Sequence, residues 1–114
     1  IGSLTAAFSM SLALAQKEGL GLDKFMTIVR DSALYAPTFD KKLERMCDRN
    51  FTNPNFPTKH LLKDMNLFVQ AAQAKGIDAT VAKGVSEVTE NAIAQGLANE
   101  DYSSIYSAIT PKDS

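Results

Sequence analysis

Apolar residues along this chain recur at intervals of three and four positions, the spacing of a helix that buries one face. The first such stretch covers residues 1–18 and ends at Gly19, because glycine adopts the left-handed conformation that follows many helices. Its apolar stripe comprises Leu4, Phe8, Leu12 and Ala15, flanked by the small residues Ala6, Ala7, Ser9, Ser11 and Ala13. The pattern predicts a central helix that several neighbours can approach closely.

Two shorter helices are predicted next. The first is capped by Asp23 and ends near Ser32, and the second starts at Pro37, because proline is favoured in a first turn. The predicted inward-facing residues are Phe25, Ile28 and Val29 in the first, and Phe39, Leu43, Met46 and Cys47 in the second. The charged residues of the second helix are predicted to face water; they are Asp40, Lys41, Lys42, Glu44 and Arg45.

Residues 50–57 form the one long irregular stretch. Two prolines and three asparagines exclude a helix there. Phe51 and Phe56 stand in this otherwise polar loop, which predicts that the loop is anchored on an apolar surface.

A long helix is predicted over residues 58–75, with Thr58 as cap and Gly76 as terminator. Its inward stripe is Leu61, Met65, Phe68 and Ala72. Near its N-terminus Lys59, His60 and Lys63 share the polar face. This arrangement fits an anion site, but it is also what an ordinary solvated face looks like, and spacing alone favours the solvated face.

The last two predicted helices complete an all-α fold. Asp78 caps the first of them and Gly96 ends it, whereas Asn99 or Glu100 opens the second, before Pro111. Their inward residues are Val81, Val85, Val88 and Ala92, then Tyr102, Ile105, Tyr106 and Ile109. No stretch alternates with a period of two, so we predict one helical domain of about six helices over residues 1–110, followed by a mobile tail at 111–114.

Composition narrows the function classes. Hydrophobic residues make up 45% and charged residues 22% of the 114 positions, as in folded globular domains. Twelve basic and 13 acidic residues give a net charge of −1, so we expect no nucleic-acid partner. Cys47 is the single cysteine, which excludes an internal disulfide and fits a reducing compartment such as the cytoplasm.

The common chemical motifs are missing from the sequence. One histidine and one cysteine give no recognisable metal site, and nothing orients Cys47 and His60 as a nucleophile pair. There is no glycine-rich phosphate-binding motif. The apolar run at residues 1–15 is interrupted by polar residues and lacks a basic start, so neither a membrane span nor a signal peptide is expected. These patterns alone name no function.

Four segments in order nevertheless carry a family resemblance. They are Ser11–Leu20 (SLALAQKEGL), Asn55–Leu67 with its Lys63-Asp64 pair, Ala71–Ile77, and Gly96–Tyr106 with its DYSSIY sequence. Together they resemble the C-terminal helical domain of the β-hydroxyacid dehydrogenase family, which includes 3-hydroxyisobutyrate dehydrogenase, tartronate semialdehyde reductase and glyoxylate/succinic semialdehyde reductases. The implied fold is that of the 6-phosphogluconate dehydrogenase C-terminal domain.

The resemblance implies a larger enzyme. An upstream Rossmann domain, absent from this chain, would bind most of the NAD or NADP, and a long helix would lead from it into Ile1. The catalytic lysine and asparagine of the family, in a K-x-x-x-N pattern, would lie several residues before Ile1. The chain would therefore hold no catalytic residue and be inactive alone. The helical pattern already running at position 1, with no cap before it, agrees with such an upstream helix. The implied partners are a small hydroxyacid or semialdehyde substrate and further copies in a homodimer or homo-tetramer.

The resemblance also implies site residues. Lys63 would reach the cofactor and the substrate carboxylate, and Phe56 would wall the nicotinamide pocket. Asp64, about 100° away around the helix, would belong to the substrate site by orienting the surroundings of Lys63 or tying the helix to the neighbouring loop. Ser32 and Tyr35 match positions of substrate-pocket residues. Each has a plainer alternative: Phe56 as a core anchor, Asp64 as a surface charge, and Ser32 and Tyr35 as packing at a helix end.

The sequence departs from the family pattern at two positions, and one alternative function stays open. Met10 stands where the family often has glutamate, and His60 matches no catalytic residue, so we expect His60 to pair with Asp64 one turn later. The alternative function is a non-catalytic helical interaction module with the same fold. The substrate and the choice between NAD and NADP stay open.

Overall fold

The computed structural model describes residues 1–112 and builds them from helices joined by short connections. The α-helices are α1 (Gly2–Lys17), α2 (Leu22–Arg30), α3 (Pro37–Asp48), α4 (Thr58–Ala74), α5 (Thr80–Ala94) and α6 (Ile105–Ile109), with the 3₁₀ turn η1 (Tyr102–Ser104) before α6. Within residues 1–112 the only β-type pairing is an isolated bridge between Pro57 and Asp101. The predicted all-α fold of about six helices is confirmed.

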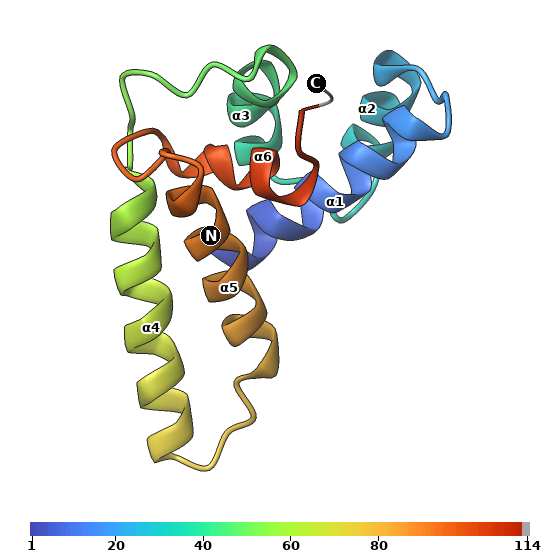
Figure 1. Ribbon diagram of the computed structural model, residues 1–114. Coiled ribbons are helices and arrows are strands. Elements are labelled where there is room, and N and C mark those ends of the chain that lie inside the picture. Colours follow the sequence, from blue (N-terminus) through green and yellow to red (C-terminus); the bar gives the residue numbers. More distant parts are fainter. Residues whose placement is uncertain (113–114) are drawn as a thin grey trace.

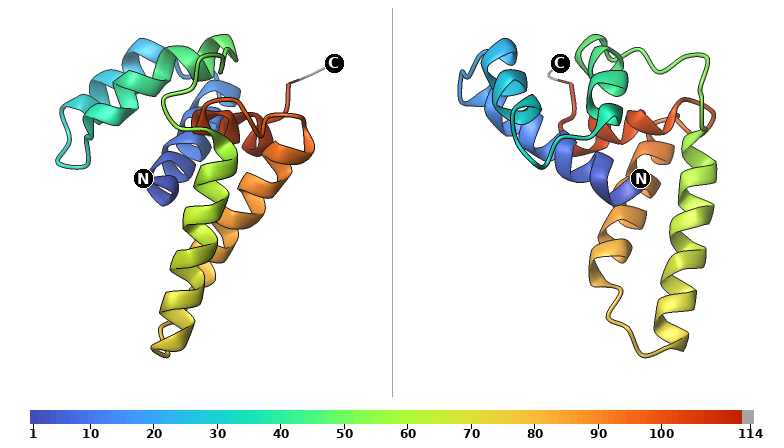
Figure 2. Two further views of the ribbon diagram at one scale, coloured as in Figure 1. Left: turned by 90° about the vertical axis from the view of Figure 1, so that its left-hand side faces the viewer. Right: turned by 180° about the vertical axis from the view of Figure 1, so that it is seen from behind.

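Helix α1 organises the domain. It contacts α2, α3, α5 and α6. Helices α4 and α5 run antiparallel, side by side, and project away from the other helices (Figure 1, Figure 2). The start of α1 lies close against this pair, since a Cβ added at Gly2 would come within 3.0 Å of the side chains of both Leu61 and Met65. Of the small residues predicted to allow close approach, Ser9 and Ala13 are buried, whereas Ala7 and Ser11 are exposed.

Two apolar clusters form the core. The first joins α1, α2, α3 and α6, and in it the rings of Phe8 and Phe39 stack with centroids 4.4 Å apart. The second joins α4, α5 and α6 around Leu61 and Ile105, which are 1% and 0% exposed. The predicted anchor role of the loop phenylalanines holds, because Phe51 is buried and Phe56 packs against the second cluster.

Several predicted inward positions are wrong. Ile28 is 65% exposed while its neighbour Met26 is buried, and Phe68 and Val81 are 61% and 75% exposed. The last two lie where α4 and α5 project as a two-helix hairpin. A helix with one neighbour buries a narrow stripe, so residues at the edge of the apolar face stay in water.

The predicted orientation of α3 is also wrong at two positions. Lys42 was expected to face water and is buried, whereas Cys47 was expected inward and is exposed. Lys42 stands three residues after Phe39 and four before Met46, so it lies on their buried stripe. Its burial has a partner 59 residues away, described below, which local periodicity does not reveal.

Helix ends follow the glycines. Gly19, Gly76 and Gly96 adopt φ values of +80°, +70° and +87° after α1, α4 and α5, confirming the predicted terminators. The carboxylate of Asp78 accepts a hydrogen bond from the amide of Thr80, at 2.9 Å, in the first turn of α5.

Three predicted caps are wrong. Helix α2 begins at Leu22, so Asp23 lies inside its first turn. The hydroxyl of Thr58 donates to the carbonyl of Glu100 at 2.9 Å, and no side chain makes a capping hydrogen bond at the start of α4. The final helical segment is opened by Asp101, whose carboxylate accepts from the amide of Ser103, and not by Asn99 or Glu100.

Helix α6 is followed by a short C-terminal segment. Pro111 and Lys112 are exposed, and the rest of the predicted tail, residues 113–114, lies outside the described residues. Among the helices of residues 1–112, none combines the length and apolarity needed to cross a bilayer.

Two glycines should respond oppositely to alanine. Gly84 lies inside α5 with no atom within 4 Å of an added Cβ, so Gly84→Ala should stabilise the domain by about 0.5–1 kcal/mol. Gly96 has φ +87°, so Gly96→Ala should destabilise it by about 1–2 kcal/mol. Urea unfolding of both variants checks this, and shifts of the same sign would contradict it.

Candidate functional site

The loop of residues 50–57 leads into α4 and is held against residues 98–102. The amide of Thr58 donates to the carbonyl of Glu100 at 2.8 Å, and that of Lys59 donates to the carbonyl of Ala98 at 3.0 Å. The amide of Tyr102 donates to the carbonyl of Phe56 at 2.7 Å. The first amides of α4 therefore find carbonyl partners from a segment about 40 residues later in the chain, which fixes where α4 starts.

Phe56 lies at the centre of this junction. Its ring meets Tyr102 edge to face at 6.1 Å and lies 6.0 Å from the ring of His60. The residue is half-buried. Phe56 thus anchors the loop and still offers one side to solvent, so the two sequence-based interpretations are compatible.

Lys63 and Asp64 lie on α4 with exposed side chains. Within residues 1–112 neither makes a hydrogen bond or ion pair, and the expected His60–Asp64 pair does not form, because the ring of His60 packs beside Phe56. Asp64 lines a shallow groove of about 270 Å³, whose other lining residues are Ile1, Gly2, Ser3, Leu61, Met65, Phe68 and Ala82. Lys63 does not line that groove, as its different position around the helix requires.

Ser32 and Tyr35 lie in the connection between α2 and α3. The hydroxyl of Ser32 donates to the carbonyl of Val29 at 2.8 Å, which closes the end of α2. The hydroxyl of Tyr35 donates to Asp40 at 2.5 Å, and Arg30 holds the same carboxylate through a 2.6 Å ion pair. Both residues thus have local structural partners.

The predicted site residues fall into two groups. Phe56, Lys63 and Asp64 lie around the start of α4, whereas Tyr35 packs edge to face on Phe39 in the first core cluster. No hydrogen bond in the described part of the chain links Ser32 or Tyr35 to the first group. In the described residues, no ion pair or aromatic ring contact joins the two groups either.

The Arg30–Tyr35–Asp40 cluster predicts a measurable titration. Hydrogen bonds from Arg30 and then Tyr35 lower the pKa of Asp40 to about 2. Because the folded value lies below the unfolded one, the ionised form stabilises the fold above about pH 4, and this contribution is lost as the pH falls through 2. Arg30→Gln and Tyr35→Phe should each raise the pKa of Asp40 in an NMR titration, and an unchanged value in both would contradict the cluster.

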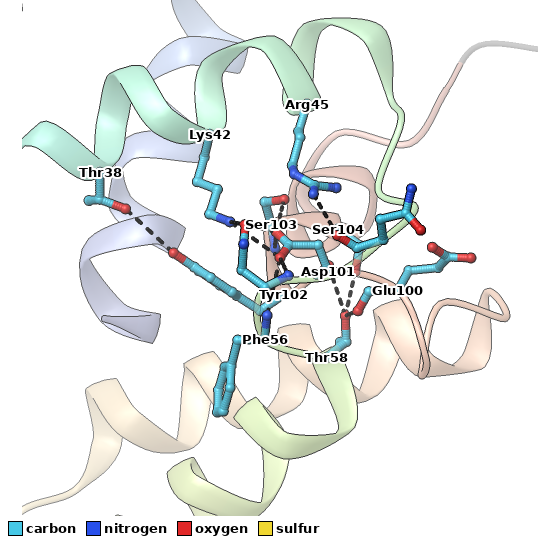
Figure 3. A network of polar contacts seen from close by, with 12 residues as sticks. Thr38, Lys42, Arg45, Phe56, Thr58, Glu100, Asp101, Tyr102, Ser103 and Ser104 are labelled. Atoms are coloured by element: carbon cyan, nitrogen blue, oxygen red, sulfur yellow. Dashed lines mark hydrogen bonds and ion pairs between the residues drawn. The ribbon is translucent and has the colours of Figure 1, made fainter.

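The polar group with the most hydrogen-bond partners in residues 1–112 is the carboxylate of Asp101, a residue for which the sequence predicts no role (Figure 3). One oxygen, Oδ1, accepts from the amides of Asn55 and Phe56 at 3.0 and 3.4 Å. The other, Oδ2, accepts from the amide and hydroxyl of Ser103 at 3.1 and 2.5 Å. Lys42 Nζ donates to both oxygens, at 3.2 and 3.1 Å. We call these five residues the Asp101 network.

In this network, hydrogen bonds and the opposite charge of Lys42 offset the cost of burying the Asp101 carboxylate. The side chains of Lys42 and Asp101 are 7% and 0% exposed. Burial opposes ionisation of Asp101, but the Ser103 hydroxyl, the Lys42 ammonium and the Ser103 amide outweigh it, so the pKa of Asp101 lies below its ordinary value. Lys42 Nζ also donates to the side-chain oxygen of Asn55 at 3.2 Å and lies 4.8 Å from the Tyr102 ring centroid. The pair is therefore fully supported by hydrogen bonds.

One local signal could have revealed half of the network. Lys42 interrupts the apolar stripe of α3, and a lysine on such a stripe indicates a buried partner. Asp101 carries a weaker signal, an acidic residue two positions before a serine, as in a capped turn. Their pairing across 59 positions has no local signature.

The described residues contain no group of three or more histidine, cysteine, aspartate or glutamate side chains that could hold a metal ion.

Comparisons with known proteins identify the domain. Residues 1–109 match the family model described as "NAD-binding of NADP-dependent 3-hydroxyisobutyrate dehydrogenase". The chain is 33% identical over 109 residues to glyoxylate/succinic semialdehyde reductase 1 of Arabidopsis thaliana, covering 96% of this chain and 37% of that protein. It is 28% identical over 107 residues to the human cytokine-like nuclear factor N-PAC, covering 94% of this chain and 19% of that protein.

A solved structure has a similar fold. The crystal structure of 3-hydroxyisobutyrate dehydrogenase from Salmonella typhimurium superposes with a TM-score of 0.81 at 25% identity, over 92% of this chain and 36% of that one. The chain spans roughly a third of the length of the reductase and the dehydrogenase it matches. Because the family model covers nearly every residue and the helical fold agrees, this chain belongs to the 3-hydroxyisobutyrate dehydrogenase family of NAD(P)-dependent hydroxyacid dehydrogenases.

Proposed function

We propose that this chain is the C-terminal helical part of an oxidoreductase that transfers a hydride between a nicotinamide cofactor, NAD or NADP, and a small hydroxyacid or semialdehyde. The observation that carries the proposal is the match to the family model over residues 1–109. The names of the similar plant reductases support glyoxylate and succinic semialdehyde as the first substrates to test.

The start of α4 fits one wall of a cofactor and substrate site. Lys63 offers an exposed ammonium without a protein partner in residues 1–112, suited to a carboxylate or to the ribose and amide edge of a nicotinamide nucleotide. Phe56 offers a half-buried aromatic surface nearby. The bound nicotinamide would supply or accept the hydride, while Lys63 orients the anionic substrate and Phe56 excludes water from one side.

The proposal places the catalytic lysine and asparagine upstream. Asp64 lines the same groove as Ile1, Gly2 and Ser3. If α1 continues upstream at about 1.5 Å per residue, a lysine one or two turns before Ile1 lies within about 11 Å of that groove along the helix axis. Asp64 would then orient the side chains at this junction. The 114-residue chain alone should be inactive, because the proton-transferring group would lie in the upstream segment.

Self-association follows from the same proposal. Helix α1 exposes Met10 and Leu14, at 59% and 63%, on a helix that is otherwise central to the domain. We propose a homodimer or homo-tetramer in which further copies cover this face. The cytoplasm remains the proposed location.

One observation favours the non-catalytic alternative. The similar protein N-PAC is named as a nuclear factor and not as a reductase, so this helical domain also occurs in a protein whose name states no such activity. The Asp101 network and core would serve equally well in an interaction module.

Turnover separates the two functions. The full-length protein, with its native upstream sequence, should oxidise NADPH or NADH in the presence of glyoxylate or succinic semialdehyde, whereas the 114-residue chain should not. The absence of turnover with either cofactor and both substrates would favour the interaction module.

A further inference from the structure

The Asp101 network connects three segments that are distant in the sequence. Lys42 comes from α3, Phe56 from the loop before α4, and Asp101 and Ser103 from the turn before α6 (Figure 3). Asn55 precedes Phe56 in the same loop. Asp101 Oδ1 binds two consecutive loop amides, Asn55 and Phe56. It therefore fixes the loop backbone at the residue whose ring borders the proposed site.

Main-chain bonds extend this restraint to α4. The amide of Tyr102 donates to the carbonyl of Phe56, and the amide of Asp101 donates to the carbonyl of Phe51 at 2.8 Å. The hydroxyl of Thr58, the first residue of α4, shares a 2.8 Å hydrogen bond with that of Ser104. The segment that carries Asp101 thus holds both ends of the loop and the first turn of α4.

The buried ion pair contributes to the geometry of the loop more than to the stability of the domain. A buried ion pair adds little net stability compared with apolar residues of similar size, because both charges lose their hydration. Hydrogen bonds to a carboxylate have fixed directions, which apolar contacts lack. Lys42 Nζ donates to both carboxylate oxygens of Asp101 and to the side-chain oxygen of Asn55, so it joins α3 to the loop and to the turn before α6.

We infer that the Lys42–Asp101 pair is a positioning element for the reaction, which holds Phe56 and the start of α4, with Lys63 and Asp64, in the orientation that the cofactor and substrate require. This inference rests on the proposed function. In this role the pair acts through the loop that it holds.

The test compares two neighbouring lysines in the full-length protein. Lys42→Met removes the buried charge while keeping most of the side-chain volume, and the Asn55 amide and the Ser103 amide and hydroxyl still donate to Asp101. Lys41→Met is the matched control, because Lys41 lies on the same helix, is exposed and takes no part in the network. Asp101→Asn, which removes the opposite charge, is the second variant.

Amide hydrogen exchange reports on the positioning directly. In Lys42→Met, exchange at Asn55 and Phe56 should accelerate by at least about tenfold, while amides in the middle of α5 keep their rates. In the same variant kcat/KM should fall by at least about tenfold, mostly through KM if the loop shapes binding. Lys41→Met should change neither quantity.

The possible results distinguish a failure of the positioning role from a failure of the proposed function. If the wild-type protein turns over and Lys42→Met has unchanged kcat/KM, the positioning role is overturned, whether or not the loop amides exchange faster. Unchanged exchange at Asn55 and Phe56 in both Lys42→Met and Asp101→Asn overturns it as well. If the wild-type protein has no turnover at all, the proposed function fails, and the inference about its reaction fails with it.

Discussion

Asp101→Ala should destabilise the domain by about 3–5 kcal/mol, because it leaves the Lys42 ammonium buried without its counter-charge. The substitution also removes the acceptor for the amides of Asn55, Phe56 and Ser103. Urea unfolding of the 114-residue chain measures the loss. Ser103→Ala is the control for the hydroxyl alone and should cost only about 1 kcal/mol.

A second substitution tests the cause of this loss. In the double variant Lys42→Met/Asp101→Ala no buried charge is left unpaired, so it should lose less than the sum of the two single variants. Additive losses would contradict the account of the network. The contribution of ionised Asp101 is present above its unfolded pKa and disappears as the pH falls through its lowered folded pKa, so the difference between wild type and variant should shrink in acid.

Lys63→Ala in the full-length protein should lower kcat/KM by at least about tenfold. The expected loss is a charge-assisted contact with the substrate or cofactor, about 1.5–3 kcal/mol. Because Lys63 is exposed and makes no ion pair within residues 1–112, its removal should change the free energy of unfolding by less than about 0.5 kcal/mol.

Lys59→Ala provides the matched control. Lys59 is also an exposed lysine in the first turns of α4, one turn before Lys63, and the resemblance assigns it no role. It should keep wild-type kcat/KM to within about twofold. Equal losses in both variants would indicate a general electrostatic effect, and unchanged kcat/KM in Lys63→Ala would remove Lys63 from the site.

The parts of the fold that depend on local patterns could be predicted from the sequence. Gly19, Gly76 and Gly96 end their helices as expected, since the left-handed conformation after a helix favours glycine strongly. The wrong predictions arise where tertiary contacts determine which partner a side chain binds. Thr58 could cap α4, but its hydroxyl donates to Glu100 because the segment 98–102 already supplies partners to the first turn.

In the candidate site, too, local patterns predict some features, whereas long-range contacts determine the others. Phe56 was expected to be an anchor because an aromatic residue in a polar loop seeks an apolar surface, and it does pack beside Tyr102. The charge of Lys42 favours water, but its position between Phe39 and Met46 on the apolar stripe of α3 places it on the buried face. Asp101 depends on a contact across 59 positions and could not be paired from spacing.

The most direct test of the central claim is the coding sequence upstream of Ile1. The account predicts a domain of about 150 residues that opens with G-x-G-x-x-G after a strand. It also predicts a lysine four residues before an asparagine, on the helix that runs into α1. A different upstream domain, or a dinucleotide-binding domain without that lysine, would leave Lys63 with no catalytic partner and contradict the proposed oxidoreductase.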